Sequence, residues 1–80
     1  MKKIRKNTAG IDIGAKNVFV GLESKQVKCF DTFTEGLNNL AVYLLSNKIT
    51  SVVMEATGVY WVILYDILEV HGIDVWLVDG

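Results

Sequence analysis

Two short apolar runs, residues 50–54 and 73–78, are separated by a stretch whose length suits one helix. Both runs are rich in β-branched side chains, so they predict two β-strands. Strands joined through a helix are parallel, and the crossover between them is right-handed in nearly all proteins. This unit is the strongest constraint on the fold, because it requires a parallel pair within an α/β sheet.

The first third of the chain predicts three further strands. Residues 9–13 form a short apolar run, residues 18–22 form another, and residues 27–33 alternate apolar and polar side chains. Turn-forming residues at 14–17 and a polar reversal at 23–26 separate the three runs. We therefore expect an antiparallel meander, preceded by a flexible basic lead-in.

The period of the apolar positions then changes from that of a strand to that of a helix. The stripe has the spacing i, i+3, i+4, i+7, i+8 and consists of Leu37, Leu40, Ala41, Leu44 and Leu45. Thr32 or Thr34 is expected to cap this helix. A second helix is predicted over residues 58–71, with Thr57 as its cap and Gly72 as its C-terminal stop.

The predicted fold class is therefore α/β, with the element order β-β-β-α-β-α-β. If the strand at 50–54 pairs with the strand at 9–13, the sheet order is 3-2-1-4-5. Two right-handed crossovers in the same direction place both helices on one face. The last two strands are apolar at nearly every position, as in strands covered on both faces. We expect later chain or a partner subunit to cover the other face.

Composition supports one domain over residues 9–80, with residues 1–8 as the lead-in. A chain of this size buries only about 60% of its unfolded surface, yet 51% of these residues are hydrophobic. Part of the covering structure is therefore expected to lie outside the 80 residues.

Charge and cysteine content indicate which partners and which cellular compartment to expect. Residues 1–40 hold seven Lys or Arg against four Asp or Glu, whereas residues 41–80 hold one against five. The basic arm is either a nucleic-acid contact or a solvated tail. The single cysteine, Cys29, fits a reducing cytoplasm, and no apolar stretch is long enough to span a bilayer.

Two carboxylates lie near the carboxyl ends of the predicted parallel strands. Asp12 lies in the middle of the first strand, and Glu55 directly follows the fourth. The carboxyl ends of neighbouring parallel strands are where open α/β sheets hold their sites. Two such carboxylates repel each other unless a cation joins them. Mg²⁺, or Mn²⁺ in its place, is the expected cation, since hard cations take oxygen ligands and keep waters for phosphate substrates.

Other residues are candidates for contacts with nucleic acid. Thr57 and Gly58 open the predicted second helix, whose free amides can receive a phosphate. Lys16 and Lys25 lie in the predicted turns, where they either contact a phosphate backbone or are simply solvated. Tyr60, Trp61 and Tyr65 can stack on bases, although helical spacing beside Leu64 and Leu68 favours packing.

The segments "GIDIG" (10–14) and "MEATGVYW" (54–61) together resemble the N-terminal domain of the DEDD-type insertion-sequence transposases, the IS one-ten group. Recent members are called bridge-RNA-guided recombinases. The resemblance covers most of the chain, and "MEATGVYW" is its specific part. It implies a ribonuclease-H-like, Holliday-junction-resolvase-like fold with a four-carboxylate metal site, in which Asp12 matches the first aspartate and Glu55 the glutamate.

The same resemblance implies partners and missing parts. Members cut and rejoin DNA, some with a guide RNA, and a homo-oligomer is expected. Their two remaining aspartates follow the fifth strand, and their nucleophilic serine lies in a later domain. We therefore expect this chain to be truncated after the fifth strand and inactive alone. Asp79 occupies a position where members often have Asn-Pro, and it is not assigned as a ligand.

Two other interpretations stay open. Actin-like ATPases and sugar kinases also begin with Gly-Ile-Asp-x-Gly and share this element order, so topology does not separate them from the nucleases. Saturable binding of ATP with Mg²⁺ would favour the ATPase or kinase interpretation. The glutamate-led "EATGVYW" favours the nuclease-like branch. The third interpretation is a non-catalytic oligomerisation module, which the uncovered sheet face makes plausible.

Overall fold

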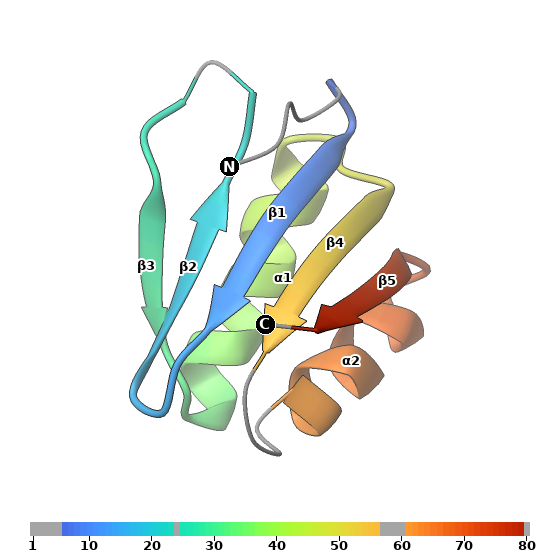
Figure 1. Ribbon diagram of the computed structural model, residues 1–80. Helices are drawn as coiled ribbons and strands as arrows, with labels where there is room; N and C mark the ends of the chain where they lie inside the picture. The colour runs from blue at the N-terminus through green and yellow to red at the C-terminus, as the bar shows by residue number, and fades with distance from the viewer. Residues whose placement is uncertain (1–5, 24, 57–60, 80) are drawn as a thin grey trace.

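The computed structural model describes residues 6–23, 25–56 and 61–79, which form a sheet and two helices (Figure 1). The elements are β1 (Thr8–Ile13), β2 (Asn17–Gly21), β3 (Lys28–Asp31), α1 (Thr34–Ser46), β4 (Ser51–Ala56), α2 (Trp61–Val70) and β5 (Asp74–Asp79). The predicted order β-β-β-α-β-α-β is confirmed.

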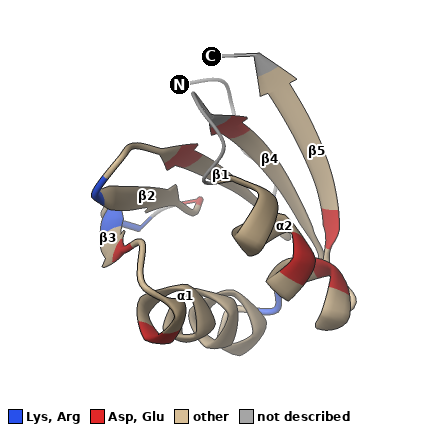
Figure 2. Cartoon of the chain, turned by 90° about the horizontal axis from the view of Figure 1, so that it is seen from below, with Lys and Arg blue, Asp and Glu red and all other residues tan. Residues whose placement is uncertain are grey.

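The sheet has five strands in the order β3-β2-β1-β4-β5, as the sequence predicted. The β1–β2 and β2–β3 pairs are antiparallel, and the β1–β4 and β4–β5 pairs are parallel. Both helices lie on the same side of the sheet (Figures 1 and 2). The predicted placement of the helices on one face is therefore also confirmed.

The fourth strand is longer than its apolar run. Its parallel pairing with β1 continues as far as Ile13 opposite Ala56, so Glu55 lies inside the strand rather than after it. The third strand is shorter than predicted and ends at Asp31, because the chain then turns towards α1. The predicted cap Thr57 and the predicted start of the second helix lie outside the described residues.

The predicted threonine cap of α1 is wrong. Phe33 occupies the N-cap position and makes no side-chain cap hydrogen bond. Asp31 takes over the turn instead, since its Oδ1 accepts the backbone N–H of Phe33 at 3.0 Å. The Thr32 hydroxyl donates to the Ala15 carbonyl at 3.5 Å, towards the β1–β2 turn, and Thr34 is already the first helical residue.

The C-terminal end of α2 follows the prediction. Gly72 has φ +77°, the left-handed conformation that a glycine adopts without strain. The backbone N–H of Ile73 donates to the Leu68 carbonyl at 3.0 Å, which closes the turn. His71 Nδ1 lies 2.7 Å from the Ile67 carbonyl oxygen, so the His71 side chain lies against the last turn of the helix.

The core lies between the sheet and the two helices. Its largest fully buried side chains come from both layers, and no polar or charged residue of the described chain is buried with them. These side chains are Leu40, Leu44, Met54, Leu64, Leu68, Val18, Val20 and Val52. The helix stripe and the inward positions of the strands therefore account for the packing, because burying apolar surface is the main favourable term in folding.

The opposite side of the sheet, called the open face below, has no helix over it in the described chain (Figure 2). It carries large apolar side chains that are 43% exposed at Phe19, 41% at Val53, 67% at Trp76 and 43% at Val78. The prediction of a bare face is thus confirmed for the residues that the structure describes. Neither described helix is long and apolar enough to cross a membrane.

Gly36 in α1 gives the first testable prediction. A Cβ built at this buried position would clash with the Asp31 side chain and lie 2.8 Å from the Asp31 carbonyl oxygen. Replacing a helical glycine with alanine ordinarily stabilises by about 1 kcal/mol. Here Gly36→Ala is expected to destabilise by about 1–3 kcal/mol through overpacking.

Urea unfolding followed by circular dichroism measures this change. Asn39→Ala, at an exposed position of the same helix, is the control and should be neutral or slightly stabilising. A higher urea midpoint for Gly36→Ala would contradict the close approach of the helix to Asp31.

Candidate metal and nucleic-acid site

Asp12 and Glu55 lie side by side. Asp12 of β1 is the register partner of Glu55 of β4 in the parallel pair. Neighbouring strands are about 4.8 Å apart, and register partners point to the same face. Both residues are exposed, and each is followed by the last residue of its strand. The structure therefore brings the two predicted carboxylates together on the open face, at the carboxyl ends of β1 and β4.

Strand alternation explains how an apolar strand accommodates Asp12. Ile11 and Ile13 are buried on the helix side, so the residue between them points to the open face. Met54 is likewise buried on the helix side, which puts Glu55 on the open face. The apolar neighbours in sequence belong to the other side of the sheet, and the two charges reach solvent.

The carboxylate pair belongs to a row of residues that crosses the whole sheet. The registers align Cys29, Phe19, Asp12, Glu55 and Val78, each from a different strand. The pair thus has an apolar neighbour on either side and no basic residue in its row. Like charges directly opposite each other on paired strands are destabilising, so the row offers a ready position for a cation.

The pair fits part of a magnesium site. Mg²⁺ is commonly held by one or two carboxylates together with waters and substrate phosphates, and this open position leaves room for both. Among the described residues, no group of three or more His, Cys, Asp or Glu is placed to hold a metal. A magnesium ion at this position would therefore take two carboxylate ligands from Asp12 and Glu55, and a complete site would need further ligands.

The two predicted lysines lie at opposite ends of the sheet. Lys16 is in the turn between β1 and β2, which the Gly14 N–H closes by donating to the Asn17 carbonyl at 2.9 Å. That turn is at the same end as the carboxylates, because β1 ends there. Lys25 lies in the connection between β2 and β3, at the far end. Of the two lysines, only Lys16 lies close enough to contact the same ligand as the Asp12–Glu55 pair. Thr57 and Gly58 lie outside the described residues.

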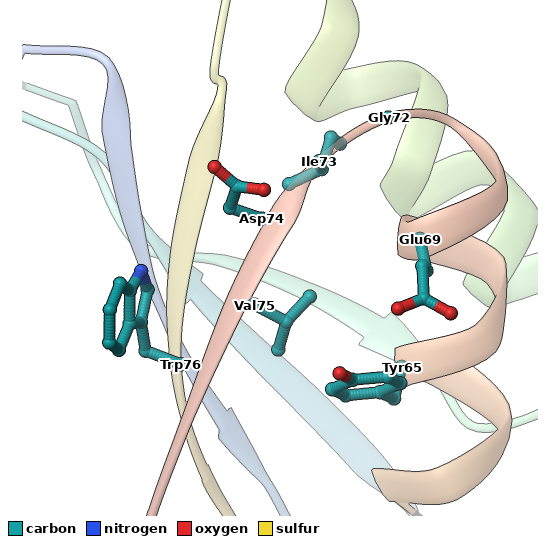
Figure 3. A pocket seen from close by; sticks show the side chains of 7 residues that line it. All are labelled: Tyr65, Glu69, Gly72, Ile73, Asp74, Val75 and Trp76. Carbon is teal, nitrogen blue, oxygen red and sulfur yellow. The ribbon is translucent and has the colours of Figure 1, made fainter.

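Of the aromatic candidates, Trp61 packs against the core, whereas Tyr65 also lines a groove. Trp61 is half-buried against the core and packs edge-to-face on Tyr65, with ring centroids 6.1 Å apart. The packing role that the spacing favoured for Trp61 is thus confirmed. Tyr65 also lines an open groove of about 420 Å³ between α2 and β5 (Figure 3). Tyr60 lies outside the described residues.

Two features were missed at the level of sequence. Phe19 stands next to Asp12 in the row, and only the hairpin register reveals this. The α2–β5 groove combines Tyr65 and Glu69 of α2 with Val75 of β5. The i, i+4 spacing of Tyr65 and Glu69 puts both on one side of a helix, which was the available signal for this groove.

No protein-family model matches this sequence, and the search of curated proteins finds no match. The fold class therefore rests on the topology of the sheet, and any function rests on the geometry of the site.

Removing one charge of the pair should stabilise the chain. Asp12→Asn or Glu55→Gln relieves a like-charge contact between register partners, so either change should raise the free energy of unfolding by about 0.2–1 kcal/mol. The gain should shrink in 1 M NaCl, because salt screens exposed charges. Urea unfolding at low and high salt measures both effects.

Glu23→Gln, which removes an exposed acid outside the sheet, is the matched control and should change little. A clear loss of stability at low salt in both Asp12→Asn and Glu55→Gln would show that the two carboxylates do not repel each other.

Proposed function

We propose that this chain forms the N-terminal part of a ribonuclease-H-like catalytic domain of a DNA transposase or recombinase of the DEDD insertion-sequence type. The observation that carries the proposal is the register pairing of Asp12 with Glu55 on adjacent parallel strands. Further support comes from the sheet order 3-2-1-4-5, the order expected from the element sequence. The substrate is DNA, with a guide RNA as a further partner that the resemblance suggests.

In this proposal, Asp12 and Glu55 hold Mg²⁺ or Mn²⁺ against a phosphodiester. A metal bound there supplies Lewis-acid polarisation of the phosphate and activation of the attacking group. The two carboxylates orient the cation, and the open face leaves the carboxyl ends of β1 and β4 accessible to a nucleic-acid backbone. Lys16, in the turn at the same end, contacts the phosphates next to the reacting one. The remaining carboxylates and the nucleophile come from other parts of the protein.

The proposed compartment is the cytoplasm. Cys29 is the single cysteine of the sequence and is exposed and free. Such a residue forms no internal disulfide, which suits a reducing environment.

Metal binding by the 80-residue chain tests the site without catalysis. Mn²⁺ titrated into ¹⁵N-labelled protein should broaden amide resonances around residues 12 and 55 first. We expect roughly millimolar affinity, because the described residues bring only these two carboxylates together. Asp12→Asn and Glu55→Gln should each remove the selective broadening, and Glu23→Gln should keep it.

Three outcomes of the titration would contradict the proposal. A submicromolar site would mean that the described residues already complete a metal centre. Broadening that ignores both substitutions would place the metal elsewhere. Saturable binding of ATP with Mg²⁺ at the β1–β2 turn would favour the actin-like ATPase instead.

The proposal implies a longer protein that carries this domain, and catalysis is tested in that protein. Asp12→Asn or Glu55→Gln should reduce DNA recombination at least about 100-fold, the scale of losing one electrostatic group from an active site. Circular dichroism should show an unchanged fold, since both side chains are exposed. Full recombination by either folded variant would remove that residue from the site.

We also propose that copies of the isolated chain associate through the open face. Val53 and Trp76 are register partners and form an exposed apolar row there. This row lies about 6.6 Å from the row of Asp12 and Glu55 along the strands, at 3.3 Å per residue. Contiguous exposed apolar surface of this kind marks interaction sites, and a contact centred on Val53 leaves the carboxylates at its margin.

Sedimentation velocity measures this association. The average mass should rise with concentration, and Val53→Lys should return the chain to a monomer by placing a charge in the contact. Val42→Lys, at an exposed apolar position on α1, should leave the association unchanged. A monomer at every accessible concentration would contradict the proposed contact.

A further inference from the structure

The outer edge of β5 carries a second surface, independent of the carboxylate pair. In the described chain β5 pairs only with β4, so its other edge lies at the margin of the sheet (Figure 1). The strand is six residues long. An edge of this length presents a row of backbone N–H and C=O groups with no strand partner, which can pair with an added strand.

The two edges of the sheet differ in how they are protected. The opposite edge, β3, is only four residues long and carries Lys28 and Asp31 at its ends. Short length and charge are the devices by which natural sheets block pairing at an edge. The interior of β5, residues 75–78, is Val-Trp-Leu-Val, without charge or proline. Both edge strands have charged residues at their ends, so the longer uncharged interior of β5 is what distinguishes it.

The groove beside β5 defines what an added strand would meet. Figure 3 shows Tyr65 and Glu69 on α2 facing the Val75 side of the strand, with Trp76 on the opposite side. Successive side chains of a strand point to opposite faces. An added strand would thus direct alternate side chains into the groove at Glu69 and the others towards the open face beside Trp76.

The charges around the groove indicate what kind of segment can bind there. The sequence contains no Lys or Arg from residue 49 to residue 80. Glu69 lies in the groove, Asp66 is an exposed acid on the same helix, and Asp74 begins the strand. This acidic surface repels nucleic-acid phosphates and attracts cationic side chains.

A second copy of β5 is a poor occupant by the same reasoning. Antiparallel pairing of two β5 strands about their midpoint would set Asp74 opposite Asp79 of the other copy, at both ends. Like charges directly opposite each other are destabilising. A partner strand with basic residues removes this conflict.

We propose that the free edge of β5, with the adjoining α2–β5 groove, binds an extended basic segment of a partner protein by strand addition. Backbone hydrogen bonds from β5 hold the segment. Its Lys or Arg side chains enter the groove, where Glu69 pairs with them and the Tyr65 ring offers a cation–π contact. Its apolar side chains, which alternate with the basic ones, pack beside Trp76. This surface is separate from the carboxylate pair and does not depend on metal chemistry.

A blocked heptapeptide that alternates lysine and valine is the probe. Titrated into the ¹⁵N-labelled chain at 150 mM NaCl, it should shift amides of β5 and of the α2 face that carries Tyr65. A glutamate–valine peptide of the same length should bind at least about tenfold more weakly. A lysine–valine peptide with N-methylated alternate amides should lose binding, because it cannot complete the backbone ladder.

Charge reversal on the protein locates the contact. Glu69→Lys should weaken binding of the lysine–valine peptide about threefold or more, whereas Glu35→Lys, on the exposed first turn of α1, should not. Both side chains are exposed, so circular dichroism should confirm that both variants keep the fold.

Four results would overturn the proposal. They are equal binding of the acidic peptide, equal binding of the N-methylated peptide, equal effects of Glu69→Lys and Glu35→Lys, and shifts confined to the open face around Val53. Concentration-dependent shifts of β5 amides without peptide, together with no response to the peptide, would assign the edge to a second copy instead.

Discussion

The parallel pairing of β1 with β4 is the interaction on which the rest of the structure depends. It joins the antiparallel meander to the crossover unit, and it runs from Thr8 opposite Ser51 to Ile13 opposite Ala56. At its start, the hydroxyl groups of Thr8 and Ser51 form a hydrogen bond of 2.8 Å. At its end stand two carboxylates. A slip of one residue would turn Asp12 towards the helices, so the register that buries Ile11 and Ile13 also fixes the position of the site.

The one-sided sheet divides the molecule into surfaces of different character. The helix side is closed and apolar, and the open face carries the Asp12–Glu55 pair near one end and the Val53–Trp76 row in its middle. The β5 edge adds an acidic surface, with Glu69 in the adjoining groove and Asp74 at the start of the strand. Phosphate contacts and peptide contacts would therefore use different parts of the chain: metal can neutralise the pair on the open face, whereas only cationic side chains suit the edge.

The topology could be predicted from the sequence because it depends on apolar periodicity and on the handedness of crossovers. The helix stripe through Leu37 and Leu44 and the β-branched runs are local patterns that packing reinforces. The cap of α1 could not be predicted, since Asp31 competes with Thr32 for the same turn and only the folded loop decides between them. The proximity of Asp12 and Glu55 followed from topology alone. Their exposure did not, because residues 9–13 form an apolar run and only the folded strand shows that Ile11 and Ile13 are buried while Asp12 is exposed.

The lysines show a different limit of sequence reasoning. Both Lys16 and Lys25 lie in connections of the meander, and the sequence offers no distinction between them. Chain direction separates them, because successive connections of a meander fall at opposite ends of the sheet. The α2–β5 groove was missed for a similar reason. Its residues come from two elements whose relative placement no local pattern contains.

The carboxylate pair is the one place where local preference and the fold disagree. Every other row of the β1–β4 ladder places apolar or hydroxyl side chains or glycine together, while Asp12 and Glu55 set like charges together. Natural sequences tend to keep such conflicts at functional positions, where a ligand resolves them. A cation bound by both carboxylates would stabilise the folded chain over the unfolded one, since the unfolded chain does not hold the two groups together. The same register that sets the two like charges together would then make the β1–β4 ladder, and with it the whole sheet, more stable when the cation is bound.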